Sequence, residues 1–157
     1  MKTQIGIKPE DSVQVADALN KLLSDEHVLY IKTRNAHWNV EGPDFASVHK
    51  FFESQYDELE GIIDSVAERI RSIGHYAEGT MSEYLKLTQL SEESREGNDS
   101  PSYIKDLLSD HEAVIIELRE NITRFAEELL DLGTSDFITG LMETHEKLAW
   151  MLRAHLK

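Results

Sequence analysis

The segment DFASVHKFFESQYDELEGIIDSVAERIRSIG, residues 44–74, decides the fold class of this chain. Its apolar side chains recur every three or four residues, which is the period of an amphipathic α-helix. The members of this stripe are Phe45, Val48, Phe52, Tyr56, Leu59, Ile63, Val66, Ile70 and Ile73. Asp44 can cap the start of such a helix and Gly74 can end it, so we predict a helix over roughly 44–73.

The same period continues upstream and downstream of this segment. Upstream, the stripe of Val15, Leu19, Leu22, Leu29, Thr33 and His37 predicts a helix over roughly 11–39. The sequence Val40-Glu41-Gly42-Pro43 then breaks that helix. Downstream, apolar residues with helical spacing predict a third helix from Pro101 to Leu129. A last helix runs through Leu152, and Gly133 and Thr134 separate it from the third.

The connection between the second and third helices, residues 74–100, is long for a compact domain and should contain structure of its own. Thr80-Met81-Ser82-Glu83 has the pattern of a capping box and predicts a short helix. No segment alternates with period two, so we expect no strands. Four long helices with one long crossover describe an all-α, ferritin-like four-helix bundle with a short extra helix in the crossover between helices 2 and 3. We expect residues 1–157 to form a single domain.

Composition narrows the chemistry of the chain. Its 157 residues carry 16 Lys and Arg against 30 Asp and Glu, for a formal net charge of −14, and it has no cysteine. Disulfides, thiol catalysis, cysteine-ligated zinc and iron–sulfur clusters are therefore excluded. The absence of an apolar run long enough for a span predicts no membrane segment, and we expect a cytoplasmic protein. An acidic chain favours cations over DNA as partners, and any metal must be held by His and carboxylates.

The second predicted helix carries two pairs of metal-ligand residue types, each on one face. His49 and Glu53 form one pair, and Asp64 and Glu68 form the other. Eleven residues separate Glu53 from Asp64, which places the two pairs about 16 Å apart along the axis. Ligand bonds of about 2 Å cannot span that distance. Two antiparallel copies of the helix, related by a two-fold axis near residues 58–59, would bring the pairs together in two identical sites.

The remaining histidines divide into one candidate ligand and several others. His37 lies just before the Gly42-Pro43 turn and His49 just after it, so a helical hairpin brings these two together. Mixed His and carboxylate ligands suit iron(II), and less well manganese or zinc. An iron pair inside one bundle would need Glu-x-x-His motifs, and the chain has none. We therefore expect His111 and His145 to be core or interface residues with satisfied nitrogens. We expect His27 to be exposed or to lie at a seam between subunits.

A two-part motif resembles the Dps family, the miniferritins named as DNA-binding proteins from starved cells. It comprises His37-Trp38-Asn39-Val40-Glu41-Gly42-Pro43-Asp44-Phe45, followed by His49, Phe52, Tyr56, Asp64 and Ala67-Glu68-Arg69-Ile70. The resemblance extends over essentially the whole chain, to the closing Trp150-Met151-Leu152-Arg153-Ala154. It implies a hollow dodecamer with ferroxidase sites at its two-fold interfaces.

In such a site, the resemblance implies that His37, His49 and Glu53 come from one subunit, and Asp64 and Glu68 from its mate. Many family members carry Asp where this chain has Glu53. The implied reaction is oxidation of Fe(II) by hydrogen peroxide or O₂, with storage of the ferric mineral in the cavity. Iron (Fe²⁺/Fe³⁺) is the implied metal, and no organic cofactor is expected.

Two further features have both a structural and a functional interpretation. Glu127, Asp131 and Asp136 flank the junction of the last two helices, with Asp136 in the first turn of the final helix. The resemblance assigns such carboxylates to a pore through which iron enters, whereas the residues alone indicate helix capping. Trp38 is either an acceptor of oxidising equivalents or an aromatic residue packed at the dimer seam.

Two alternatives to a ferroxidase remain open. The first is a nucleoid-associated protein that protects DNA by binding it. Family members that do so use Lys-rich tails, whereas here Lys2 and Lys8 are partly balanced by Glu10. We therefore predict no appreciable direct DNA binding at physiological salt. The second alternative is a structural or adaptor bundle, for which removal of His37 and His49 would leave iron handling unchanged.

Overall fold

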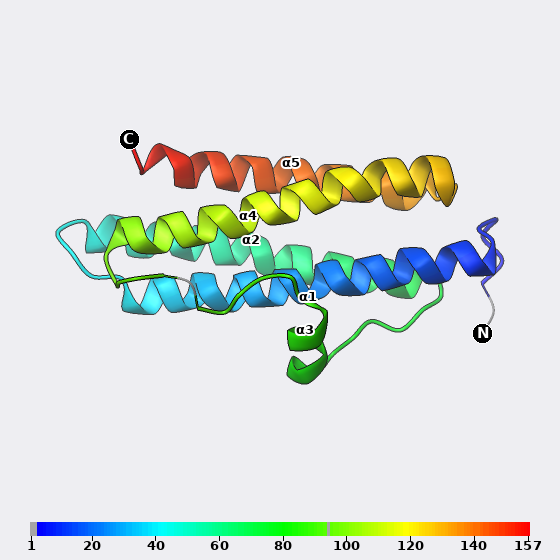
Figure 1. Cartoon of the computed structure of the whole chain (residues 1–157), viewed down its shortest axis with the longest axis horizontal. Coiled ribbons are helices and arrows are strands. Elements are labelled where there is room, and N and C mark those ends of the chain that lie inside the picture. The colour runs from blue at the N-terminus through cyan, green and yellow to red at the C-terminus, as the bar shows by residue number, and fades with distance from the viewer. Residues whose placement is uncertain (1–2, 94) are drawn as a thin grey trace.

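The computed structural model describes residues 3–93 and 95–157, in which four long helices lie side by side (Figure 1). The elements in chain order are α1 (Pro9–Asn39), α2 (Phe45–Ser72), α3 (Met81–Leu87), α4 (Ser100–Thr123), the π-helix η1 (Arg124–Glu128) and α5 (Leu132–Ala154). Within the described ranges there is no strand, and one isolated bridge joins Glu41 to Asp99. The all-α prediction, with four long helices and a short one in the crossover, is confirmed.

The helices pack as two antiparallel hairpins, α1 with α2 and α4 with α5 (Figure 1). The crossover leaves the far end of α2, passes α3 on the outer side of α1, and returns along the bundle to the start of α4. The turn between α1 and α2 therefore lies beside the start of α4, at the same end of the bundle. None of the helices in the described part of the chain is both long and apolar enough to cross a membrane.

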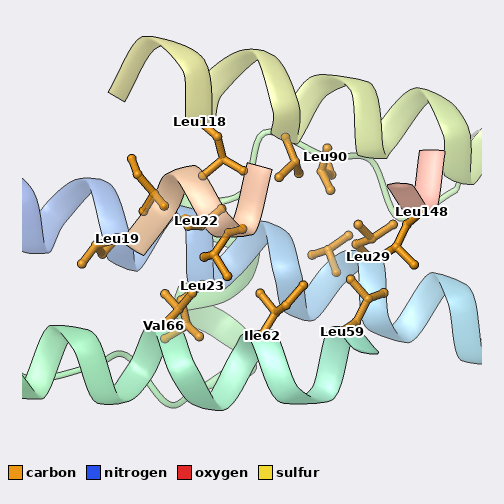
Figure 2. Packing of buried hydrophobic residues seen from close by; sticks show 14 of the residues in the cluster. Leu19, Leu22, Leu23, Leu29, Leu59, Ile62, Val66, Leu90, Leu118 and Leu148 are labelled. Atoms are coloured by element: carbon orange, nitrogen blue, oxygen red, sulfur yellow. The ribbon is translucent and has the colours of Figure 1, made fainter. Parts of the chain in front are cut away.

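The core lies between the two hairpins, where the predicted stripes meet (Figure 2). Leu19, Leu23 and Leu29 of α1 are almost fully buried, as are Leu59 of α2 and Leu118 of α4. Each such leucine contributes roughly 1.5–3 kcal/mol through the removal of apolar surface from water. The stripe prediction fails at Phe45, which is 44% exposed because it lies in the first turn of α2, at the end of the bundle.

Polar side chains of α1 attach the crossover to the bundle. The fully buried Asp25 accepts hydrogen bonds from the Thr88 hydroxyl at 2.6 Å and from the Gln89 backbone N–H at 2.9 Å. Lys32 donates to the Ser91 carbonyl at 2.8 Å. These bonds satisfy backbone and side-chain groups that would otherwise be costly to bury, and they hold the crossover against α1.

The caps of the helices explain where each one begins and ends. As predicted, Thr80 caps α3 by accepting from the Glu83 N–H at 3.3 Å. Asp44 occupies the predicted N-cap position of α2, but its carboxylate accepts a hydrogen bond from Ser100 instead of capping the helix. Gly74 ends α2 with φ of +97°, where a Cβ would lie 2.6 Å from the Thr3 hydroxyl oxygen. Only glycine fits both the backbone conformation and that close approach.

The predicted boundary between the last two helices was wrong. The third helix was expected to reach Leu129, and the helical segment does continue to Glu128, although its last five residues form the wider turns of η1. We expected Gly133 and Thr134 to separate the helices, whereas both lie in the first turn of α5. The reason is the N-cap Asp131, whose carboxylate accepts from the Thr134 N–H at 2.9 Å and so starts the helix ahead of the glycine.

Candidate metal site

His37 and His49 lie face to face where α1 ends and α2 begins. Their ring centroids are 3.7 Å apart, with an interplanar angle of 21°. Two reciprocal hydrogen bonds lock the rings, because Nδ1 of His37 lies 2.7 Å from the His49 carbonyl and Nδ1 of His49 lies 2.7 Å from the His37 carbonyl. The short turn after Val40 makes this exchange possible, since it returns the chain beside the last turn of α1.

This arrangement assigns the tautomer of both histidines. A carbonyl oxygen only accepts hydrogen bonds, so each Nδ1 carries a proton and each neutral ring keeps its lone pair on Nε2. Metal-binding histidines commonly donate their second ring nitrogen in this way, which fixes the ring and raises its basicity as a ligand. The structure therefore confirms that the hairpin brings His37 and His49 together, and it leaves both Nε2 atoms as electron-pair donors.

An aromatic cluster packs against this pair. Tyr56 meets the His37 ring edge to face, with centroids 5.3 Å apart. The Arg34 guanidinium lies over the rings of Tyr56 at 4.8 Å and Trp38 at 5.1 Å, and it donates to the Tyr30 hydroxyl at 2.7 Å. Burial raises the pKa of Tyr56, and the negative charge of Glu53 acts in the same direction. The Trp38 ring is 59% exposed in the single chain. This ring therefore leaves a large apolar surface beside the histidines.

The three predicted carboxylate ligands, Glu53, Asp64 and Glu68, are exposed along α2. Glu53 follows His49 by one turn of the helix. Asp64 and Glu68 lie further along the same helix, toward its opposite end. Among the described residues of one chain, no group of three or more His, Asp or Glu is placed to hold a metal ion. One chain therefore presents the histidine pair and the Asp64–Glu68 pair as separate halves.

His111 and His145 form a different kind of pair, in the middle of the bundle. Their Nδ1 atoms are 2.9 Å apart, and Nε2 of His145 lies 2.8 Å from Oε1 of Glu26. All three residues are at most 1% exposed. Burial, and to a lesser extent His145, holds the pKa of His111 well below its ordinary value. The expectation of core histidines is confirmed.

Glu26 is the residue that sequence reasoning missed in this core group. It continues the stripe of α1 between Leu22 and Leu29, at a position where the helical period requires a buried side chain. A carboxylate at a core position needs a partner, and this was the available signal. Its second oxygen, Oε2, is buried and has no hydrogen-bond partner among the residues that the structure describes.

The acidic residues near the α4–α5 junction have separate roles. Asp131 is 3% exposed, caps α5 and accepts from Arg69 at 3.4 Å, so its carboxylate is used within the chain. Glu127 is exposed on η1. Asp136 is exposed on α5, but the expectation that it lies in the first turn was wrong, because α5 already begins at Leu132. Of the three carboxylates, Glu127 and Asp136 are thus exposed, whereas Asp131 is buried.

The sequence is similar to those of ferritin-like proteins over most of its length. The chain matches the Ferritin family, the ferritin-like domain, over residues 16–157. DNA protection during starvation protein 2 of Bacillus anthracis is 38% identical over 143 residues, which cover 91% of this chain and 97% of that relative. These matches extend over nearly the full length of both sequences.

Solved structures agree with this relationship. The crystal structure of the Dps protein from Vibrio cholerae superposes with a TM-score of 0.92 at 34% identity, covering 100% of this chain and 98% of that one. That protein is described as a member of a broad superfamily of ferritin-like diiron-carboxylate proteins. Dps from Mycobacterium smegmatis superposes with a TM-score of 0.91 at 32% identity, covering 99% and 94% of the two chains.

Proposed function

This chain belongs to the Dps family of ferritin-like proteins, and we propose that it oxidises ferrous iron at sites shared between two subunits and stores the ferric product. The observation that carries the proposal is the locked histidine pair. Its two Nε2 atoms keep their lone pairs in a chain that has no complete set of ligands of its own among the described residues. The missing ligands must then come from another copy.

A second copy of α2, antiparallel to the first, supplies what the site lacks. A two-fold axis halfway between the two ligand pairs sets His49 and Glu53 of one chain against the partner subunit's Asp64 and the partner subunit's Glu68. The exposed Trp38 and the free carboxylates are consistent with a surface that a second subunit covers. Each such dimer holds two identical sites, because a two-fold interface is isologous. Twelve such chains would close into a hollow shell.

The chemistry of the donors suits the oxidation of Fe(II) by peroxide. Neutral imidazole nitrogen and carboxylate oxygen together favour ferrous iron and leave positions open for the oxidant. Two ferrous ions give up one electron each, and the O–O bond of one hydrogen peroxide molecule breaks. Both oxygens leave as hydroxide or water, so no hydroxyl radical is released. O₂ is the alternative oxidant of the same site.

The residues divide this work between holding iron and compensating its charge. His37 and His49 hold the ferrous ion through their Nε2 atoms. The partner subunit's Asp64 and the partner subunit's Glu68 complete the site and offset the extra positive charge that oxidation creates. Glu53 reaches one methylene further than an Asp would at this position and can ligate from the histidine side. The exposed Glu127 and Asp136 would line the pore through which iron enters.

The decisive experiment follows the ratio of iron to peroxide. Metal-free oligomer is loaded anaerobically with Fe(II) and given substoichiometric hydrogen peroxide while the ferric absorbance is recorded. We expect fast oxidation at one peroxide per two irons, lost in the double variant His37→Ala/His49→Ala. Oxidation no faster than in buffer would refute the ferroxidase and leave the two alternatives, a DNA-binding protein and an adaptor bundle.

Protection of DNA would then be chemical, through the removal of iron and peroxide. The relative from Bacillus anthracis is named for DNA protection, but this chain has a formal net charge of −14, so twelve chains would carry −168. Such a charge opposes contact with phosphates. We expect plasmid mobility on a gel to be unchanged at about 150 mM salt without divalent metal. Retardation under those conditions would favour direct binding of DNA.

A further inference from the structure

We propose that His27 is an additional nitrogen ligand for the ferrous ion, supplied to the interfacial site by the same subunit that supplies Asp64. This inference rests on the proposed function and extends it to a residue that lies outside the two-part motif. It predicts that each site receives histidine nitrogens from both subunits.

The first observation is the position of His27. A cavity of about 530 Å³ lies between α1, α2 and the crossover, and it is lined by His27 together with Glu60, Asp64, Glu78 and Tyr84 among others. Asp64 is one of the predicted iron ligands, so His27 and Asp64 open onto the same space. Three carboxylates around one cavity create a negative potential that attracts a divalent cation.

The second observation is the protonation state that the backbone imposes. Nδ1 of His27 lies 2.8 Å from the Leu23 carbonyl, so this nitrogen carries the proton and Nε2 keeps the lone pair of the neutral ring. Within the described part of the chain, no hydrogen bond involves Nε2. His37 and His49 have the same arrangement, because Nδ1 of each donates a hydrogen bond to a carbonyl and Nε2 keeps a lone pair that can bind a metal.

The third observation is that the ring is held in place. His27 stacks on Tyr84, with centroids 4.0 Å apart and an interplanar angle of 18°. The Tyr84 hydroxyl in turn donates to the Glu78 carbonyl at 2.9 Å, and the Glu78 N–H donates to Asn20 at 2.9 Å. Metal ligands gain affinity when neighbouring groups fix their orientation in this way, because less conformational entropy is lost on binding.

The fourth step follows from the antiparallel packing of α1 and α2. In the single chain, His27 lies toward the Asp64 half of α2, whereas His37 lies toward the His49 half. When the two-fold axis brings the partner subunit's Asp64 to His37 and His49, the partner subunit's His27 is brought along with it. One chain holds no complete cation site among its described residues, which agrees with a ligand set divided between two chains.

The test measures ferrous binding without turnover. Anaerobic calorimetric titration of Fe²⁺ into the intact oligomer compares wild type with His27→Phe, which keeps the stacking on Tyr84 but has no ligating nitrogen. His155→Phe is the matched control, because Nδ1 of His155 also lies 2.9 Å from a backbone carbonyl, that of Met151, at the exposed end of α5. Size-exclusion elution confirms that each variant assembles, and His27→Gln replaces His27→Phe if the latter does not.

We expect His27→Phe to weaken the tightest Fe²⁺ binding about tenfold, and His155→Phe to leave it unchanged. In the Co²⁺-loaded oligomer, His27→Phe should lower the visible d–d absorption, because the metal loses a nitrogen ligand. Unchanged affinity and an unchanged Co²⁺ spectrum would overturn the role of His27. His37→Ala/His49→Ala is titrated in parallel. If this double variant loses Fe²⁺ binding while His27→Phe binds Fe²⁺ like wild type, the role of His27 is refuted but the ferroxidase proposal stands.

Discussion

The molecule contains two pairs of histidines that differ in which ring nitrogens the fold leaves free. His37 and His49 use Nδ1 to donate hydrogen bonds to backbone carbonyls, and each keeps the lone pair of Nε2 at the end of the bundle. His111 and His145 bond to each other through Nδ1 in the core, and His145 spends its second nitrogen on Glu26. The same residue type therefore keeps a lone pair available for a metal in one place and belongs to a core polar network in the other.

This difference shows that the spacing of histidines matters less than what surrounds them. In each pair, the two histidines come from neighbouring helices that pack against each other, α1 with α2 and α4 with α5. Only His37 and His49 lie beside a tight turn, where the ring of each histidine reaches the backbone carbonyl of the other. The two pairs should therefore differ in their effects on the rate of iron oxidation, on stability and on the response to pH.

The largest effect is expected on the rate of iron oxidation. His37→Ala/His49→Ala should lower it by about a hundredfold or more, because the site loses both of its nitrogen donors on one subunit. His111→Gln should leave the rate unchanged, since the core pair takes no part in binding iron. Stopped-flow ferric absorbance after mixing Fe(II)-loaded protein with peroxide measures both. Equal losses in the two variants would remove the distinction between the pairs.

The next effect is on stability, and it belongs to the core pair. Glu26→Ala leaves the buried His145 Nε2–H without an acceptor, and should lower the free energy of unfolding by about 1–3 kcal/mol. Glu26→Gln retains an acceptor oxygen and should cost less. Denaturant titration at neutral pH compares the two, with His49→Ala as the control from the edge pair. A Glu26→Ala variant as stable as wild type would show that the core network contributes nothing.

A smaller effect concerns acid. Burial lowers the pKa of His111 in the fold, whereas in the unfolded chain the residue titrates near 6.5. Below that pH the unfolded state binds a proton that the folded state does not, so stability falls as the pH falls. Between pH 7 and pH 5 this contribution costs about 2 kcal/mol. His111→Gln cannot titrate, so the difference in unfolding free energy between it and wild type should change by that amount.

The neighbouring Asp110 changes the pH dependence of stability in the opposite direction. Because Asp110 is present in both wild type and His111→Gln, its contribution cancels in the difference between their unfolding free energies. Burial raises the pKa of Asp110 to about 6, although Lys32 lies 2.5 Å from its carboxylate and opposes the change. The stability that this group contributes is greatest at low pH and is lost as the pH rises toward 6. Parallel pH profiles for wild type and His111→Gln would contradict the assignment of the acid effect to His111.

The smallest effect distinguishes a cap from a pore. Asp131→Asn weakens the ion pair with Arg69 and alters the cap of α5, so it should lower the free energy of unfolding by about 1 kcal/mol. It should not change the rate at which iron reaches the sites. Asp136→Asn should do the reverse, because its exposed carboxylate has no role in the cap. Thermal unfolding and iron-uptake kinetics of both variants test this pair of expectations.

Sequence periodicity predicted the helices because each had to bury a continuous stripe, and it failed where local chemistry decided the outcome. The stripe of α1 from Val15 to His37 is buried as predicted. The period placed the end of the third helix within one residue of Glu128, but it contains no signal for the wide turns of η1. The prediction that Gly133 separates the last two helices is wrong because the cap formed by Asp131 depends on side-chain geometry that spacing alone does not reveal.

The sequence by itself determined the all-α fold, the pairing of His37 with His49 and the separation of the carboxylates on α2, because all three follow from the helical period and one short turn. Only the tertiary structure decided which histidine nitrogens are free. The same holds for the partnership of Glu26 with His145 and for the shared cavity of His27 and Asp64. Those relationships join helices that are distant in sequence, and they depend on packing angles and side-chain directions that no one-dimensional pattern specifies.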